Sequence, residues 1–275
     1  MSYRYGPAQS MENGLGSATE QVLFLNAKLP IVLNQQNIWY NDLTYQGSYV
    51  NYSDDVTTEP AIGLHQFILQ TGWVRKLNED QAFQVLLVPR LMSDLEHIDG
   101  DHFQFGGIGL YEQRFSDNLL MRFGGMFNTD RFGPMFVPLI YADWNISTKW
   151  FLIGLVPIYS KIGYRMTERM TIGVSQFGLI TSFQMGDPAF NDDYIERKSI
   201  DLSVFVRYQV TGNIYLEPRV GYAVGRSYRQ FNSGDQVDYR IAILTVGDSR
   251  TQQNTSFDPG IIFDLRFVYN LPVPD

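Results

Sequence analysis

The feature that most constrains this chain is a two-residue alternation that runs from Lys198 to Val224. Polar residues separate the apolar ones, which are Ile200, Leu202, Val204, Val206, Tyr208, Ile214, Leu216, Val220, Tyr222 and Val224. Side chains alternate between the two faces of a β-strand, so this period predicts a hairpin with one apolar face and one charged face. In a soluble sandwich the charged face meets water. In a transmembrane barrel the apolar face meets lipid and the charged face lines the interior.

The turn of this hairpin, Thr211-Gly212-Asn213, sets its predicted register. If the turn pairs Val210 with Ile214, counting outward along both strands places Arg207 directly opposite Glu217. The charged face would then carry a cross-strand ion pair.

A second predicted hairpin repeats the arrangement around residues 116–118. Pairing Phe115 with Leu119 places Glu112 opposite Arg122. Two exposed surface pairs would contribute little to stability. Inside a narrow lumen, by contrast, the same pairs would be partly desolvated and would fix the register of the strands.

The rest of the chain repeats this rhythm, with short turns alternating with longer loops. The predicted strands are Ser2–Gln9, Gln21–Leu33, Ile38–Tyr52, Leu64–Leu77, Gln81–Met92, Phe103–Phe115, Leu119–Thr129, Pro134–Ile146, Trp150–Val156, Tyr159–Met166, Met170–Gln184, the two strands of the first hairpin, and Phe257–Tyr269. This order predicts an all-β fold, a single up-and-down antiparallel transmembrane barrel of about 14 strands, because such barrels have short turns on one side and long loops on the other. The count falls to 12 if residues 149–166 form one strand and the N-terminal piece lies outside the barrel. A soluble β-sandwich is the alternative fold.

Composition narrows the class of protein further. The net charge of -8 argues against a nucleic-acid partner, and the absence of cysteine excludes a disulfide framework and thiolate metal sites. No run of eighteen apolar residues occurs, so no transmembrane helix is expected. Barrel strands escape that criterion, because their alternation averages out in any hydropathy window. We expect one domain over residues 1–275.

The polar positions of the predicted strands supply the candidate functional residues. The expected lumen-lining set is Asp42, Gln46, Gln70, Glu112, Arg122, Asp201, Arg207, Glu217, Arg219, Asp264 and Arg266. Its mixture of acids and bases argues against a strongly ion-selective pore. It suits either a narrow, salt-bridged lumen or a general hydrophilic channel.

Four tryptophans fall near the ends of predicted strands, namely Trp39, Trp73, Trp144 and Trp150. An aromatic girdle at a membrane interface would place them there. The alternative is that they are ordinary residues of a sheet, and the position of all four near strand ends favours the girdle.

One loop concentrates histidines and carboxylates, from Asp94 to His102. His97 and His102 lie among four acidic residues, which is a donor set that divalent cations use. The spacing matches no standard metal motif, so we favour a solvated acidic loop and expect no metal and no cofactor. No catalytic motif occurs either, and no enzymatic activity is expected.

The middle of the chain resembles a known family. Pro138-Leu139-Ile140-Tyr141, Lys149-Trp150-Phe151-Leu152, Leu155-Val156-Pro157 and Tyr164-Arg165 follow one another there. This progression is similar to one in a family of Bacteroidota outer-membrane β-barrels of unassigned function. The resemblance implies a fold and a location in the bacterial outer membrane, and it carries no functional residues.

Three functions compete at this point. The first is a passive or substrate-selective outer-membrane channel, and the second is an accessory barrel in a larger complex of the Gram-negative envelope. The third, an outer-membrane hydrolase, is disfavoured because no catalytic set converges. The expected partners are outer-membrane lipid and lipopolysaccharide, with other envelope proteins in the second case and no nucleic acid.

Overall fold

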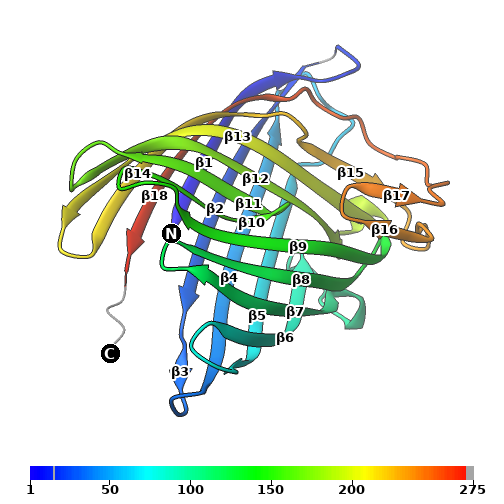
Figure 1. Cartoon of the computed structure of the whole chain (residues 1–275). Coiled ribbons are helices and arrows are strands. Elements are labelled where there is room, and N and C mark those ends of the chain that lie inside the picture. The colour runs from blue at the N-terminus through cyan, green and yellow to red at the C-terminus, as the bar shows by residue number, and fades with distance from the viewer. Residues whose placement is uncertain (15, 271–275) are drawn as a thin grey trace.

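The computed structural model describes residues 1–14 and 16–270, and almost all of its regular structure is β-strand (Figure 1). Fourteen strands pair in chain order, each antiparallel to the next, and β1 (Ser2–Ser10) pairs with β18 (Gly260–Tyr269) to close the barrel. The other barrel strands are β2 (Ser17–Lys28), β4 (Asn37–Tyr52), β5 (Ile62–Lys76), β6 (Gln81–Ser93), β7 (Phe103–Ser116), β8 (Leu119–Asp130), β9 (Gly133–Asn145), β10 (Trp150–Val156), β11 (Tyr159–Arg165), β12 (Met170–Gln184), β13 (Tyr194–Thr211) and β14 (Ile214–Ala223). The predicted fourteen-strand barrel is confirmed, and the twelve-strand count and the sandwich are excluded.

Six short elements complete the chain. They are β3 (Ile31–Val32), β15 (Ser227–Phe231), β16 (Tyr239–Ile241), β17 (Leu244–Val246) and two single-turn 3₁₀ helices, η1 (Gly100–His102) and η2 (Pro188–Phe190). β15 extends the sheet beside β13, and β16 pairs in parallel with β9. Within residues 1–14 and 16–270, no helix is long and apolar enough to cross a membrane.

The predicted charge pairs are present in the observed register. Glu112 on β7 pairs directly with Arg122 on β8. On the other hairpin, Tyr208 pairs with Leu216, so the preceding residue Arg207 falls opposite Glu217. The predicted register is therefore confirmed for both hairpins away from their turns.

The residues next to the turns pair differently from the prediction. Thr211, and not Val210, pairs with Ile214, and Ser116 pairs with Leu119. Each hairpin closes with a two-residue turn, of which Gly212 adopts the left-handed conformation with a φ of 47°. A β-bulge beside each turn then restores the predicted register.

The exterior of the barrel is apolar. Leu202, Leu216 and Phe263 are exposed, at 51%, 37% and 47% of their residue surface, whereas the intervening charged residues are half-buried or buried. All four tryptophans are also exposed, and they lie near the end of the barrel that carries the short turns. The faces are thus inverted relative to a soluble protein.

This exterior face stops midway along β12 and β13. The two strands pair without a bulge, so Tyr194 and Glu196 share the outer face with the exposed residues Leu202 and Val204. Tyr194 and Glu196 are nevertheless fully buried. Tyr194 belongs to an apolar cluster with side chains from the inner face of β9, such as Val137.

The barrel is consequently pinched at its loop end. The tip of β12 reaches β6, where Gln184 and Ser93 form a parallel bridge. Side chains of a second apolar cluster, such as Leu64, Phe183 and Phe190, fill the narrowed end. At the loop end, the inner face of β7, β8 and β9 therefore packs against the outer face of β12 and β13.

One boundary predicted from the sequence is wrong for a related reason. The sequence predicts a strand that begins at Lys198, but residues 194–197 already form the start of β13. They pair with β12 on one side and with β15 on the other. The polar sequence Glu196-Arg197 is stable in a strand because both charges find partners, as described below.

Closure of the barrel can be tested at the β1–β18 seam, because the chain has no cysteine of its own. Tyr3 and Leu265 are cross-strand partners with exposed side chains. Directly paired residues lie about 5.5 Å apart or less, which suits a disulfide. We expect Tyr3→Cys with Leu265→Cys to crosslink on oxidation, as detected by peptide mapping. Tyr3→Cys with Phe267→Cys, offset by two residues, should crosslink poorly, and equal yields would contradict a closed register.

Candidate functional site

The eleven polar residues predicted to line the interior all lie on strands of the barrel, on the face opposite the exposed apolar side chains. Four of them are buried, namely Asp42, Gln46, Asp201 and Glu217. Seven are half-buried, namely Gln70, Glu112, Arg122, Arg207, Arg219, Asp264 and Arg266. The structure brings most of the charged ones into three groups and leaves Gln46 and Gln70 outside them.

The largest group surrounds the carboxylate of Glu217, which is completely buried. Lys161 Nζ lies 2.9 Å from Glu217 Oε1, and Arg219 Nε donates to the same oxygen over 2.8 Å. Arg266 and Arg207 approach within 3.7 and 3.8 Å. Four cationic groups on β11, β13, β14 and β18 thus share one carboxylate, and the cluster carries excess positive charge.

Two further carboxylates lie next to this cluster. Arg4 on β1 forms an ion pair with Asp201 on β13, with 2.7 Å between Nη2 and Oδ2. Asp264 is the cross-strand partner of Arg219. Since β14 and β18 separate β13 from β1 in the sheet, the Arg4–Asp201 pair spans the interior.

The other predicted ion pair joins two neighbouring strands of the barrel wall, β7 and β8. Arg122 Nε donates to Glu112 Oε2 over 2.6 Å, and its guanidinium lies 4.7 Å from the ring centroid of Tyr141. The Arg122 and Glu112 side chains keep 34% and 25% of their surface exposed. Arg207 and Arg266 keep 29% and 31%. The interior near the short turns is therefore accessible to solvent.

Asp42 forms a smaller polar group on the inner face of β4. Its carboxylate accepts from the Tyr40 hydroxyl over 3.1 Å and lies 3.9 Å from Lys28 Nζ. Gln70 is its cross-strand neighbour, whereas Gln46 donates to the Ser48 hydroxyl. These residues make local contacts only.

Another ionic group, centred on Glu20, closes the loop end of the interior. The buried Glu20 carboxylate accepts from the Tyr228 hydroxyl and lies 3.5 and 3.3 Å from guanidinium nitrogens of Arg197 and Arg226. All of these side chains are buried. We did not predict this group, because Arg226 and Tyr228 belong to a long connection that shows no alternation.

A separate ionic group, centred on Glu196, lies outside the barrel proper, on the covered outer face of β13. Glu196 forms ion pairs with Arg229, Arg240 and Arg250, at 2.6, 3.0 and 2.9 Å. These arginines come from three separate parts of the connection between β14 and β18. Arg250 also donates to Asp248, and these hydrogen bonds hold the pKa of Asp248 below its ordinary value. One carboxylate thus fastens the connection to the wall.

The acidic loop that contains His97 and His102 is organised by hydrogen bonds. His102 is buried, and its Nδ1 lies 2.9 Å from Asp99 Oδ1 in a capping box for η1. Asp94 accepts from the backbone N–H groups of Gly186 and Asp187. Across the described residues, no group of three or more histidines and carboxylates has the geometry of a metal site.

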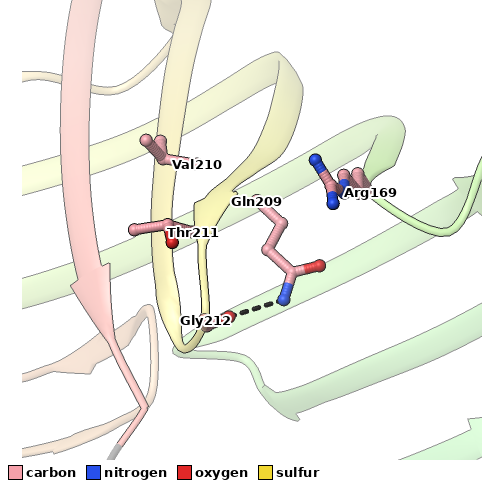
Figure 2. Close-up of a pocket in the computed structure, with 5 residues that line it drawn as sticks. All are labelled: Arg169, Gln209, Val210, Thr211 and Gly212. Carbon is pink, nitrogen blue, oxygen red and sulfur yellow. Dashed lines mark hydrogen bonds between the residues drawn. The ribbon is translucent and has the colours of Figure 1, made fainter.

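A shallow pocket lies at the short-turn end between two turns (Figure 2). It encloses about 140 Å³ and is lined by Arg169 and by residues 209–212. The Gln209 side chain donates to the Gly212 carbonyl and is thereby engaged within the turn. Arg169 is the one charged residue among those that line the pocket. The pocket offers no second group for catalysis.

Comparisons with known proteins give one family and several weak structural likenesses. The model of the family described as Domain of unknown function (DUF6268) matches residues 2–234. A NanC porin is 11% identical, with a TM-score of 0.38 over 98% of this chain and 99% of that one. A Pseudomonas aeruginosa FadL homologue is 10% identical, with a TM-score of 0.34 over 97% and 75%. The ferric-catecholate import receptor Fiu from E. coli K12 is 12% identical, with a TM-score of 0.31 over 93% and 43%. No curated protein matches in sequence.

The Glu217 cluster makes a testable contribution to stability. Glu217→Gln leaves four cations without their shared carboxylate, and we expect it to lower the free energy of unfolding by about 3–5 kcal/mol. Urea titration of the barrel in detergent micelles measures the change. Adding Lys161→Gln should restore part of the loss. Glu168→Gln, an exposed carboxylate in a short turn, is the control, and an equal effect there would contradict the role assigned to Glu217.

Proposed function

Since the chain belongs to the family described as Domain of unknown function (DUF6268), we propose a function from its own geometry. It is a non-enzymatic, porin-like transport barrel of the bacterial outer membrane, present here with its loop end closed. The observation that carries this proposal is the ionic, solvent-accessible interior that lies beneath a packed loop end. The Bacteroidota envelope is the location that the resemblance of the middle region favours.

Membrane placement is supported by the exterior. Large apolar side chains cover it, and a soluble protein rarely exposes a continuous surface of that kind. Barrels that span a membrane alternate apolar residues outside with polar residues inside. The exposed tryptophans near the short-turn end fit an interfacial girdle, in contact with outer-membrane lipid and, on the opposite leaflet, with lipopolysaccharide.

The interior supports transport of a hydrophilic solute. Arg122, Arg207 and Arg266 each keep about a third of their side-chain surface accessible. Lys161, Arg207, Arg219 and Arg266 outnumber the carboxylates beside them, which favours anions over cations near the short-turn end. This preference refines the expectation from the sequence, where acids and bases were weighed without their positions.

The pinch at the loop end supports a gate. The loop-end parts of β12 and β13 cross toward β6. Apolar side chains such as Phe183 and Phe190 fill the space that remains at the loop end of the barrel. Outward movement of this segment would widen the passage. The single bridge between Gln184 and Ser93 is a contact that such a movement would break.

An accessory barrel in an envelope complex is the second candidate function. The packed loop end favours it, because a permanently closed barrel needs no conducting path. Other envelope proteins would then be its partners, bound at the loops.

Membrane placement predicts a depth-dependent cost of charge on the exterior. Val204 lies near the middle of the exposed apolar stretch of β13, and Val210 lies near its end. We expect Val204→Arg to lower the free energy of unfolding in lipid vesicles by about 2–4 kcal/mol, and Val210→Arg by about 0–1 kcal/mol. Equal costs, or unchanged folding of Val204→Arg in water without lipid, would refute the placement.

The gate is testable with a reversible lock. Ser93→Cys with Gln184→Cys places two thiols on directly bridged residues, within reach of a disulfide. In planar bilayers, we expect the oxidised protein to be silent and the reduced protein to show stepwise current. The Tyr3/Leu265 double-cysteine variant controls for oxidation, since its disulfide ties strands that are already paired. Equal conductance of the oxidised and reduced proteins would argue against this gate. If no variant conducts in either redox state and other proteins co-purify, the accessory role is favoured.

A further inference from the structure

The wall of the barrel has a gap between β9 and β12. The hairpin of β10 and β11 fills the space between them at the short-turn end only. On β9, pairing with β10 begins at Ile140, although β9 extends to Gly133. On β12, pairing with β11 ends at Phe177, although β12 extends to Gln184. About seven residues of each long strand therefore lack a barrel neighbour on this side.

A cavity of about 170 Å³ occupies this gap, and we call it the lateral slot. Residues of β8, β9, β12 and β13 and of the β10–β11 and β16–β17 turns line it, among them Met126, Met135, Val137, Ile158, Ile180 and Ile200. Met135 and Val137 belong to the inner face of β9, whereas Ile180 and Ile200 belong to the outer face of β12 and β13. The slot thus connects the exterior surface with the inner side of the barrel wall.

A small hairpin covers the slot. β16 pairs with β9 at two positions, and the Ala242 N–H donates to the Phe136 carbonyl over 2.8 Å. Ile243 and Leu244 at the tip of this hairpin are 64% and 67% exposed. The cover is therefore held by few backbone hydrogen bonds, and its apolar tip continues the exterior surface.

The chemistry of the slot selects a hydrocarbon. Gln176 is its one polar side chain, and its amide already donates to the Pro157 carbonyl over 2.9 Å. An apolar cavity of about 150 Å³ stays free of water and binds a benzene-sized group. The slot has a comparable volume, which suffices for the end of a hydrocarbon chain, and its one polar side chain is already engaged.

A cation lies beside the slot on the same outer face. Lys198 is the cross-strand partner of Ile180 and lies two residues from Ile200 on β13. It is half-buried, and its ammonium forms no ion pair or hydrogen bond with the described part of the chain, whereas its backbone pairs with β12 and β15. Cross-strand neighbours have Cβ atoms about 4.5–5.5 Å apart, so its ammonium is within reach of a headgroup at the mouth of the slot.

We infer that the lateral slot binds the hydrocarbon chain of a single-chain anionic amphiphile, with its carboxylate at Lys198. The ligand enters from the outer leaflet, because the slot opens on the exterior near the loop end. This inference rests on the membrane location proposed above, but it does not require that the barrel conducts.

Photo-crosslinking in phosphatidylcholine vesicles tests the slot. The probe is dodecanoate that carries a diazirine at its ω carbon, and mass spectrometry maps the labelled residues. We expect labelling at Met126, Met135 or Ile158, with competition by unlabelled dodecanoate. Ile180→Trp fills the slot and should reduce this labelling about tenfold. Ile172→Trp, on the exposed face of β12 below the slot, is the matched control and should leave it unchanged.

Lys198→Gln tests the headgroup without changing the slot. We expect it to lower labelling by the carboxylate about fivefold. Labelling by the corresponding dodecanol probe should not change. In one outcome the protein floats with the vesicles, but the label is spread evenly over the exterior and Ile180→Trp does not reduce it. That result would overturn the proposed binding site in the slot and leave the membrane location standing. Protein that fails to float would overturn the membrane location as well, and equal loss of both probes in Lys198→Gln would overturn the assignment of the headgroup.

Discussion

The structure depends on one constraint, which is that a sheet closed by pairing of its first and last strands must place its two faces in different surroundings. Pairing of β1 with β18 satisfies the backbone hydrogen bonds of both end strands. Only the side chains then decide which face of the sheet meets lipid and which meets the interior. The alternation then places apolar residues outside and charges inside. Each buried charge needs a partner in the interior, because a single unpaired charge there costs several kcal/mol. Glu20 and Glu217 meet this need with cations that include some from elements not paired with their own strand, namely Lys161 on β11 for Glu217, and Arg197 on β13 with Arg226 beyond β14 for Glu20.

The pinch relaxes this constraint at one end. Residues on the outer face of β12 and β13 change surroundings midway, from the exterior to a packed interior between two parts of the same sheet. Glu196 shows how the change is stabilised, since three arginines of the long connection surround it where it would otherwise face the exterior. Because the loop-end part of β12 packs against the inner face of β9, these two strands do not pair edge to edge there. The packed loop end and the gap in the wall therefore have one structural origin.

Much of the fold was predictable from the sequence, because local alternation and turn residues decide strand limits and nearest-neighbour register. Glu112 opposite Arg122 follows from counting away from a turn. Contacts between distant strands do not follow from such counting. Lys161 reaches Glu217 across two intervening strands, and nothing near either residue in the sequence indicates the other. The partners of Glu196 lie in a connection without periodicity, and the pinch depends on where β12 meets β6, which is a tertiary contact.

The gate and the slot share one segment, residues 178–184 of β12. Its inner face carries Phe183, which packs in the closed loop end, and its outer face carries Ile180, which lines the slot. Outward movement of this segment toward β9 would widen the loop end and narrow the slot together. A ligand in the slot binds the pinched arrangement better than the widened one, and a ligand shifts an equilibrium only by such a difference in affinity. An amphiphile in the wall would therefore hold the loop end closed, which links the lipid surroundings of the barrel to the passage of solute through it.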